Sequence, residues 1–168
     1  MHALAEIADA LPWPVRIAGE ARGAALPAGV EALGRLSRAA LREVMARAAI
    51  FVHVPRYEPF GLAPLEAAAS GCALVLSDIP SLRSRWSGAA LHVGPDDRDG
   101  LAQAILSLIE RADRRSRLGE QALERGRCFD AERMTASYLD LYREVRGERE
   151  LPEGAVAIGE GGSEEVLP

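Results

Sequence analysis

Apolar residues recur along this chain with two different spacings. Spacings of three and four residues predict amphipathic helices over residues 3–11, 38–48, 101–111 and 131–146. Pro64 and Gly71 delimit a short helix within residues 63–71, and residues 117–127 form a basic helical stretch. Short apolar runs bounded by glycine or proline predict strands over residues 15–18, 29–34, 50–54, 73–77 and 89–93. Strands and helices therefore alternate over most of the chain, and the last helices follow one another.

The run Ile-Phe-Val-His-Val at residues 50–54 is the clearest of the predicted strands. It is almost wholly apolar rather than alternating, which is typical of a strand covered on both faces in a parallel sheet. Together with the alternation of elements, it predicts an α/β fold with a doubly wound, Rossmann-like parallel sheet. We expect this domain to cover residues 1–146.

Charge separates the last part of the chain from the rest. The chain has 20 arginines and no lysine against 25 acidic residues, and its net charge is −5. Residues 147–168 hold six glutamates and one arginine, so the whole acidic excess lies there. This composition predicts a disordered acidic tail. The remaining domain is neutral and has no basic stripe, so we do not expect it to bind nucleic acid.

Composition also bears on membrane insertion and metal binding. No apolar run approaches the about 20 residues that a membrane-spanning helix needs, and no leader sequence is visible. We therefore expect a cytoplasmic protein without a transmembrane segment, with peripheral association at the membrane as the alternative. The cysteines Cys72 and Cys128 and the three histidines lack metal-ligand spacing. We therefore expect reduced, structural thiols and no metal site.

The loop that follows residues 50–54 is the best candidate for a ligand site. In an open parallel sheet, ligands bind beyond the carboxyl ends of the strands, where loops lead into helices. This loop contains Glu58 and Gly61, and Glu66 follows in what we predict to be the first turn of the next helix. Backbone amides around Gly61, Leu62 and Ala63 would be unpaired there and would favour an anion such as a diphosphate.

Each of these residues also has an interpretation without a ligand. Glu66 in a first helical turn is favourable for the helix dipole alone. Without a ligand, Glu58 is interpreted as a solvated charge in the loop and Phe60 as a residue of the hydrophobic core. From the residues alone, the chain is an α/β domain with a plausible anion site.

A resemblance to a known family extends this interpretation. Residues 56–67, Arg-Tyr-Glu-Pro-Phe-Gly-Leu-Ala-Pro-Leu-Glu-Ala, resemble the E-x7-E signature of retaining glycosyltransferases with the GT-B fold, the glycosyl transferases group 1. Residues 15–19, 33–36, 70–80 and 127–146 resemble further segments of the same family. The resemblance covers about residues 1–146 and falls within the family's C-terminal, nucleotide-sugar-binding domain.

The resemblance implies a role for each residue of the loop. Glu66 would accept hydrogen bonds from the ribose of a nucleoside-diphosphate sugar, the donor. Glu58, as the catalytic residue, would hold donor-sugar hydroxyls and steady the positive charge that develops as the anomeric bond breaks. The other implied donor contacts are the backbone amides of Phe60, Gly61, Leu62 and Ala63 and, bordering the base, the turn Gly34, Arg35 and Leu36. No metal or other cofactor is implied.

The chain also departs from the family pattern. The family's diphosphate-binding Arg and Lys belong to a strand and loop that would precede residue 1, and the chain has no lysine. Arg83 and Arg85 are candidate replacements, with exposed loop charge as the alternative. Without that first strand, we expect strands 15–18 and 30–33 to form one group and the three later strands another, with unpaired edges between them.

Three functions are compatible with these residues and with the resemblance. The first is the donor-binding half of a retaining glycosyltransferase, acting on an unidentified acceptor with an acceptor-binding N-terminal half that this chain does not contain. The second is a catalytically inactive fragment or nucleotide-binding module with the same fold. The third is an unrelated doubly wound domain such as a receiver or phosphatase, although the chain lacks their acidic cluster and Cys-x5-Arg loop.

Overall fold

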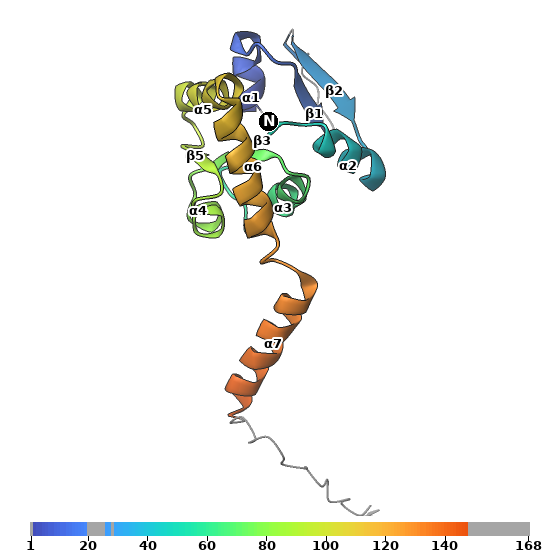
Figure 1. The fold of residues 1–168 in the computed structure, drawn as a ribbon, viewed down its shortest axis with the longest axis vertical. Helices are drawn as coiled ribbons and strands as arrows, with labels where there is room; N and C mark the ends of the chain where they lie inside the picture. The colour runs from blue at the N-terminus through green and yellow to red at the C-terminus, as the bar shows by residue number, and fades with distance from the viewer. Residues whose placement is uncertain (1, 20–25, 28, 148–168) are drawn as a thin grey trace, which may run out of the picture. The chain divides into compact units, whose positions relative to one another are not determined.

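The computed structural model describes residues 2–19, 26–27 and 29–147 (Figure 1). Its contacts divide the chain into two compact units, Met1–Phe129 and Asp130–Pro168. The acidic tail expected over residues 147–168 lies outside the described residues beyond Gly147.

The described helices and strands follow the predicted order closely. The first unit contains α1 (His2–Ile7), the 3-10 turn η1 (Ala8–Ala10), β1 (Val15–Ala18), β2 (Val30–Gly34), α2 (Arg38–Ala46), β3 (Ile50–His53), α3 (Leu62–Ala69), β4 (Ala73–Ser77), α4 (Pro80–Trp86), β5 (Leu91–Val93), α5 (Arg98–Glu110) and α6 (Ala112–Gly126). The second unit contains α7 (Ala131–Arg146). All five predicted strands are present, and the α/β class is confirmed.

The strands form two separate parallel sheets. One pairs β1 with β2, and the other has the order β3-β4-β5 (Figure 1). Ile50 of β3 lies opposite Ala73 of β4, and Val75 of β4 lies opposite Leu91 of β5. Among the described residues no strand joins β1 to β3, so the strands divide into the two groups that the sequence predicts.

The central strand β4 places the core on both faces of its sheet. Its five residues are all buried. Leu74 and Leu76 pack on one face in a cluster to which α2, α3 and α4 contribute, whereas Ala73 and Val75 pack on the other with side chains of α5. Alternate residues of a strand point to opposite faces, so a wholly apolar strand is buried on both sides. This arrangement is the doubly wound architecture that the sequence predicts.

Helix α4 is not among the helices that the sequence predicts. Pro80 is its first residue, a position that proline favours because its ring fixes a helical φ and no amide hydrogen is needed there. Only Leu82 and Trp86 of this helix are buried. Two apolar residues four positions apart are too few to distinguish a short helix from a turn.

Candidate functional site

The loop between β3 and α3 begins at the carboxyl end of the β3-β4-β5 sheet and ends at Gly61. Gly61 precedes the first helical residue with φ of +90°, a left-handed conformation that glycine adopts without steric cost. A Cβ at this position would lie 3.2 Å from Cδ2 of Leu82 and 3.3 Å from Cγ of Pro64. The loop therefore turns sharply here, against α4 and the start of α3.

Glu58 lies at the centre of this loop with its carboxylate turned toward the protein. Its Oε1 accepts the amide hydrogen of Gly61 at 2.8 Å and that of Phe60 at 3.3 Å. Its Oε2 lies 3.1 Å from Nε2 of His53, the last residue of β3. The side chain is only 24% exposed, so Glu58 is part of the structure of the loop rather than a solvated charge.

These hydrogen bonds also set the ionisation of Glu58. The hydrogen bond from His53 is the largest influence and lowers the pKa of the carboxyl group below its usual range. Partial burial opposes this effect, and the amides of Gly61 and Phe60 add to it. The native loop therefore favours the ionised carboxylate.

Three side chains from β4 and α4 fix the backbone of the same loop. Ser77 donates its hydroxyl hydrogen to the carbonyl of Pro55 at 2.6 Å, and Ser81 donates to the carbonyl of Glu58 at 2.5 Å. Arg85 donates to the carbonyl of Phe60 at 3.0 Å. Its guanidinium also lies 4.6 Å from the centre of the Phe60 ring. Because these three donors hold carbonyls from Pro55 to Phe60, the loop is anchored along its length.

The start of α3 differs from the expectation in two respects. The helix begins at Leu62, so Glu66 is its fifth residue and does not lie in the first turn, where no acidic residue is present. The amides of Phe60 and Gly61 donate to Glu58, which corrects the expectation that the amides of this segment are all unpaired. The amides of Leu62 and Ala63 occupy the first helical turn, where no partner within the helix exists. The side chain of Glu66 is exposed.

The two candidate replacement cations make different contacts. Arg83 forms a two-pronged ion pair with the carboxylate of Asp78, which follows β4. Arg85 donates to the backbone carbonyls of Phe60 and Ser81, and each hydrogen bond is 3.0 Å long. Both arginines therefore already have partners within the protein.

The turn formed by Gly34, Arg35 and Leu36 lies at the end of β2, in the other sheet. Gly34 accepts the amide hydrogen of Gly19 at 2.8 Å and has φ of +63°. Within the part of the chain that the structure describes, no hydrogen bond or ion pair links this turn to the Glu58 loop. The structure brings Glu58 and residues 60–63 together and leaves the turn as a separate element.

The sequence pattern did not predict the roles of His53, Ser77 and Ser81. His53 is one of three histidines scattered along the sequence, although it precedes Glu58 by five residues and ends the strand that leads into the loop. The regular spacing of Ser77, Ser81 and Arg85 is visible in the sequence. It indicates contacts with the loop only once helix α4 is known.

The described residues contain neither a metal-binding cluster nor a membrane-spanning helix. Among them, no group of three or more His, Cys, Asp or Glu side chains is placed to hold a metal ion. No described helix combines the length and the apolar character that crossing a bilayer requires. Burial raises the pKa of the Cys72 thiol to about 11, and its sulfur donates to the carbonyls of Met45 and Ala48, as expected of a structural thiol.

The fold and the loop define a class of protein. Solved structures with the same arrangement include sucrose-phosphate synthase of Thermosynechococcus elongatus, with a TM-score of 0.63 and 28% identity over 71% of this chain and 31% of that one. HepE of Anabaena, solved in complex with UDP-glucose, has a TM-score of 0.74 and 18% identity over 86% of this chain and 45% of that one. The structural neighbours are glycosyltransferases of the GT-B type, consistent with a Rossmann-like C-terminal half.

The family follows from the sequence match. Residues 3–125 match the family described as glycosyl transferases group 1, and the chain belongs to this family. Glycogen synthase of Mycobacterium tuberculosis is 36% identical over 124 residues, which are 70% of this chain and 30% of that protein. Alpha-maltose-1-phosphate synthase of the same organism is 33% identical over 122 residues, 66% of this chain and 31% of that protein. The chain thus spans less than a third of the length of these relatives.

Proposed function

We propose that this chain is the donor-binding half of a retaining glycosyltransferase that acts in the cytoplasm and uses a nucleoside-diphosphate sugar. The observation that carries the proposal is the loop at the start of α3. There an ionised carboxylate, Glu58, is fixed by two amides and His53, beside the amides of Leu62 and Ala63. Family membership supports the reaction class, and the resemblance at residues 56–67 supports the retaining mechanism.

The chemistry of each residue determines which part of the donor it would bind. Amide hydrogens at a helix start attract an anion, so Leu62 and Ala63 would hold the diphosphate. An ionised carboxylate can only accept hydrogen bonds, so Glu66 would bind the ribose hydroxyls. Glu58 would accept from a hydroxyl of the donor sugar and stabilise positive charge at the anomeric carbon. Arg35 and its turn would border the base, and an acceptor-binding half would complete the site.

Calorimetric titration with UDP, GDP and ADP tests donor binding directly. We expect one nucleotide to bind, and we expect Glu66→Gln to weaken binding about ten- to a hundred-fold, the effect of losing one charge-assisted hydrogen bond. Glu43→Gln, which removes an exposed carboxylate from α2, is the matched control and should bind as the unaltered chain does. Failure of all three nucleotides at millimolar concentration, with the protein folded, would reject the proposal. EDTA should leave the titration unchanged, because no metal is proposed.

The second candidate is a module that binds the nucleotide without transferring the sugar. The contacts of the two candidate cations favour it, because Arg83 pairs with Asp78 and Arg85 donates to the carbonyls of Phe60 and Ser81. The two candidates differ in one measurement, the release of nucleoside diphosphate from the donor sugar. Transfer to an acceptor or slow hydrolysis releases it, whereas a binding module retains the intact donor.

A further inference from the structure

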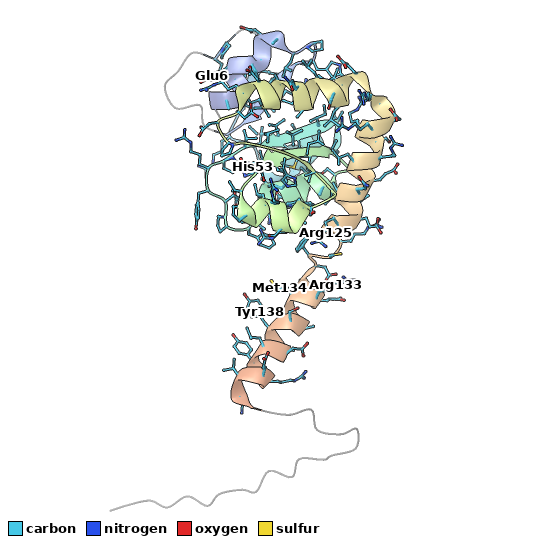
Figure 2. The ribbon with its side chains drawn as sticks, turned by 90° about the vertical axis from the view of Figure 1, so that its left-hand side faces the viewer. Glu6, His53, Arg125, Arg133, Met134 and Tyr138 are labelled. Atoms are coloured by element: carbon cyan, nitrogen blue, oxygen red, sulfur yellow. The ribbon has the colours of Figure 1, made fainter. Side chains whose placement is uncertain are left out.

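His53 lies where its ring can control the conformation of Glu58. It is the last residue of β3, and its ring stacks beside that of Phe51, two residues earlier on the same face of the strand, with 6.2 Å between the ring centres and 23° between the planes. Figure 2 labels His53 at the sheet of the first unit. The strand and the neighbouring ring therefore fix the imidazole before the loop begins.

The loop amides alone hold only one oxygen of the Glu58 carboxylate. The amides of Phe60 and Gly61 both donate to Oε1, and a group anchored through one oxygen can still swing about it. His53 holds the other oxygen, Oε2, at 3.1 Å. Anchoring both oxygens fixes the plane of the carboxylate and the directions of its lone pairs.

The acceptor positions of the carboxylate are mostly occupied. An ionised carboxylate offers about four lone-pair positions. The two amides occupy both positions of Oε1, and His53 occupies one position of Oε2. One position, on Oε2, is left for a ligand hydroxyl, and its direction depends on where His53 holds the oxygen.

Other charged groups near the loop act elsewhere. Arg56 pairs with Asp96, and Arg85 donates to the carbonyls of Phe60 and Ser81. Within the described residues, His53 is the one titratable side chain that hydrogen-bonds to Glu58. Because an ionised Glu58 can only accept, Nε2 of His53 carries the hydrogen in the neutral and in the protonated ring alike.

We propose that His53 is a positioning residue that orients the free lone pair of Glu58 toward one hydroxyl of the donor sugar. The sugar contact rests on the proposed function, whereas the control of Glu58 by His53 does not. His53 touches neither the sugar nor the diphosphate in this scheme and acts only through Glu58. Removing its hydrogen bond should therefore affect the sugar-dependent part of donor binding and leave the nucleotide-dependent part in place.

Two substitutions of His53 separate the hydrogen bond from the packing. His53→Phe keeps a ring beside Phe51 and removes the donor. His53→Gln places an amide donor near the position of Nε2 and removes the ring. Arg56→Gln removes a charge from the same loop without touching Glu58 and serves as the control.

The first measurement follows the carboxyl carbon of Glu58 by NMR during a pH titration, with Glu58→Gln used to assign the signal. We expect the midpoint to rise in His53→Phe and to stay low in His53→Gln and Arg56→Gln. An unchanged midpoint in His53→Phe would overturn the control of Glu58 by His53. This measurement needs no ligand, so it decides that part even if the proposed function fails.

The second measurement compares the affinity for a sugar nucleotide with that for the nucleotide alone, using the pairs UDP-glucose and UDP, GDP-mannose and GDP, and ADP-glucose and ADP. We expect His53→Phe to lower the affinity for the sugar nucleotide about ten-fold, the effect of one misplaced hydrogen bond. The affinity for the nucleotide alone should fall less than about two-fold. His53→Gln should restore most of the loss. Equal weakening of both ligands would overturn the positioning role and indicate general damage to the loop. Absence of binding by the unaltered chain would reject the proposed function and with it the sugar contact.

Discussion

Ser81 in the first turn of α4 donates its hydroxyl hydrogen to the backbone carbonyl of Glu58 over 2.5 Å. The two residues are 23 positions apart in the chain. The contact ties the loop after β3 to the helix after β4, so the backbone of Glu58 is held from outside its own loop. Ser77 and Arg85 hold the same loop on either side of this point. The position of Glu58 thus depends on the neighbouring β-α unit as well as on its own.

Loss of the Ser81 hydroxyl should destabilise the loop measurably. In Ser81→Ala the part-buried carbonyl of Glu58 loses its donor, and we expect the free energy of unfolding to fall by about 1 kcal/mol. Urea unfolding followed by circular dichroism measures this. Ser84→Ala is the control, because Ser84 is exposed and its hydroxyl bonds only within α4, and it should change stability by less than about 0.5 kcal/mol. Equal effects of the two substitutions would contradict the role of Ser81.

Arg85 should contribute more to the stability of the domain than to binding the negatively charged nucleotide. Its guanidinium bonds two carbonyls and lies over Phe60, so Arg85→Met should lower the free energy of unfolding by about 1–2 kcal/mol. Arg83→Met is the comparison, since its ion pair with Asp78 is exposed and such pairs contribute little. If Arg85 bound the diphosphate instead, Arg85→Met would unfold as the unaltered chain does and lose affinity for the nucleotide.

The left-handed turn at Gly61 should tolerate no side chain. Alanine there meets two penalties: the positive φ and the close approach of its Cβ to Leu82 and Pro64. Gly71→Ala supplies the control, because Gly71 has φ of +80° and a Cβ there would meet nothing within 4 Å. We expect about 1–2 kcal/mol of destabilisation for Gly71→Ala and at least about 1 kcal/mol more for Gly61→Ala. Urea unfolding of both variants checks this. Equal losses of unfolding free energy would show that the turn at Gly61 can accommodate a Cβ atom.

Much of the fold and part of the site could be predicted from sequence for physical reasons. The bounds of β1 and β4 match their predicted ranges, because β1 lies between Pro14 and Gly19 and β4 is an apolar run that ends at Ser77. Glu58 and Gly61 could be found because a carboxylate and a glycine in a loop before a helix form a local pattern. Local patterns survive folding when the tertiary structure buries the same residues that the pattern marks.

The remaining features depend on contacts between distant segments or on the path of a loop. Ser81 reaches the loop only because α4 packs beside it, and the pattern of residues 80–86 did not predict that helix. The contact between His53 and Glu58 joins residues only five positions apart, but it forms only in the path that the loop takes after β3. Such a contact depends on loop geometry, which residue spacing alone does not determine.

Acid should weaken the domain through Glu58 in a defined direction. The native loop lowers the pKa of this carboxyl group relative to the unfolded chain, with the hydrogen bond from His53 as the main cause. Its stabilising contribution is therefore present above the pKa of the unfolded state and is lost as the pH falls through the lower pKa of the native state. Glu58→Gln cannot titrate, so the difference between the two proteins isolates this carboxyl group.

We expect Glu58→Gln to be less stable than the unaltered chain by about 1–2 kcal/mol near pH 7, because charge-assisted hydrogen bonds to Gly61 and His53 are weakened. The difference should shrink as the pH falls below the ordinary pKa of glutamate, about 4.3, and through the lower pKa of Glu58 in the native state. Urea unfolding at a series of pH values measures it. A difference that stays constant over this range would mean that the native loop does not prefer the ionised carboxylate, and the account of Glu58 as a fixed anion would fail.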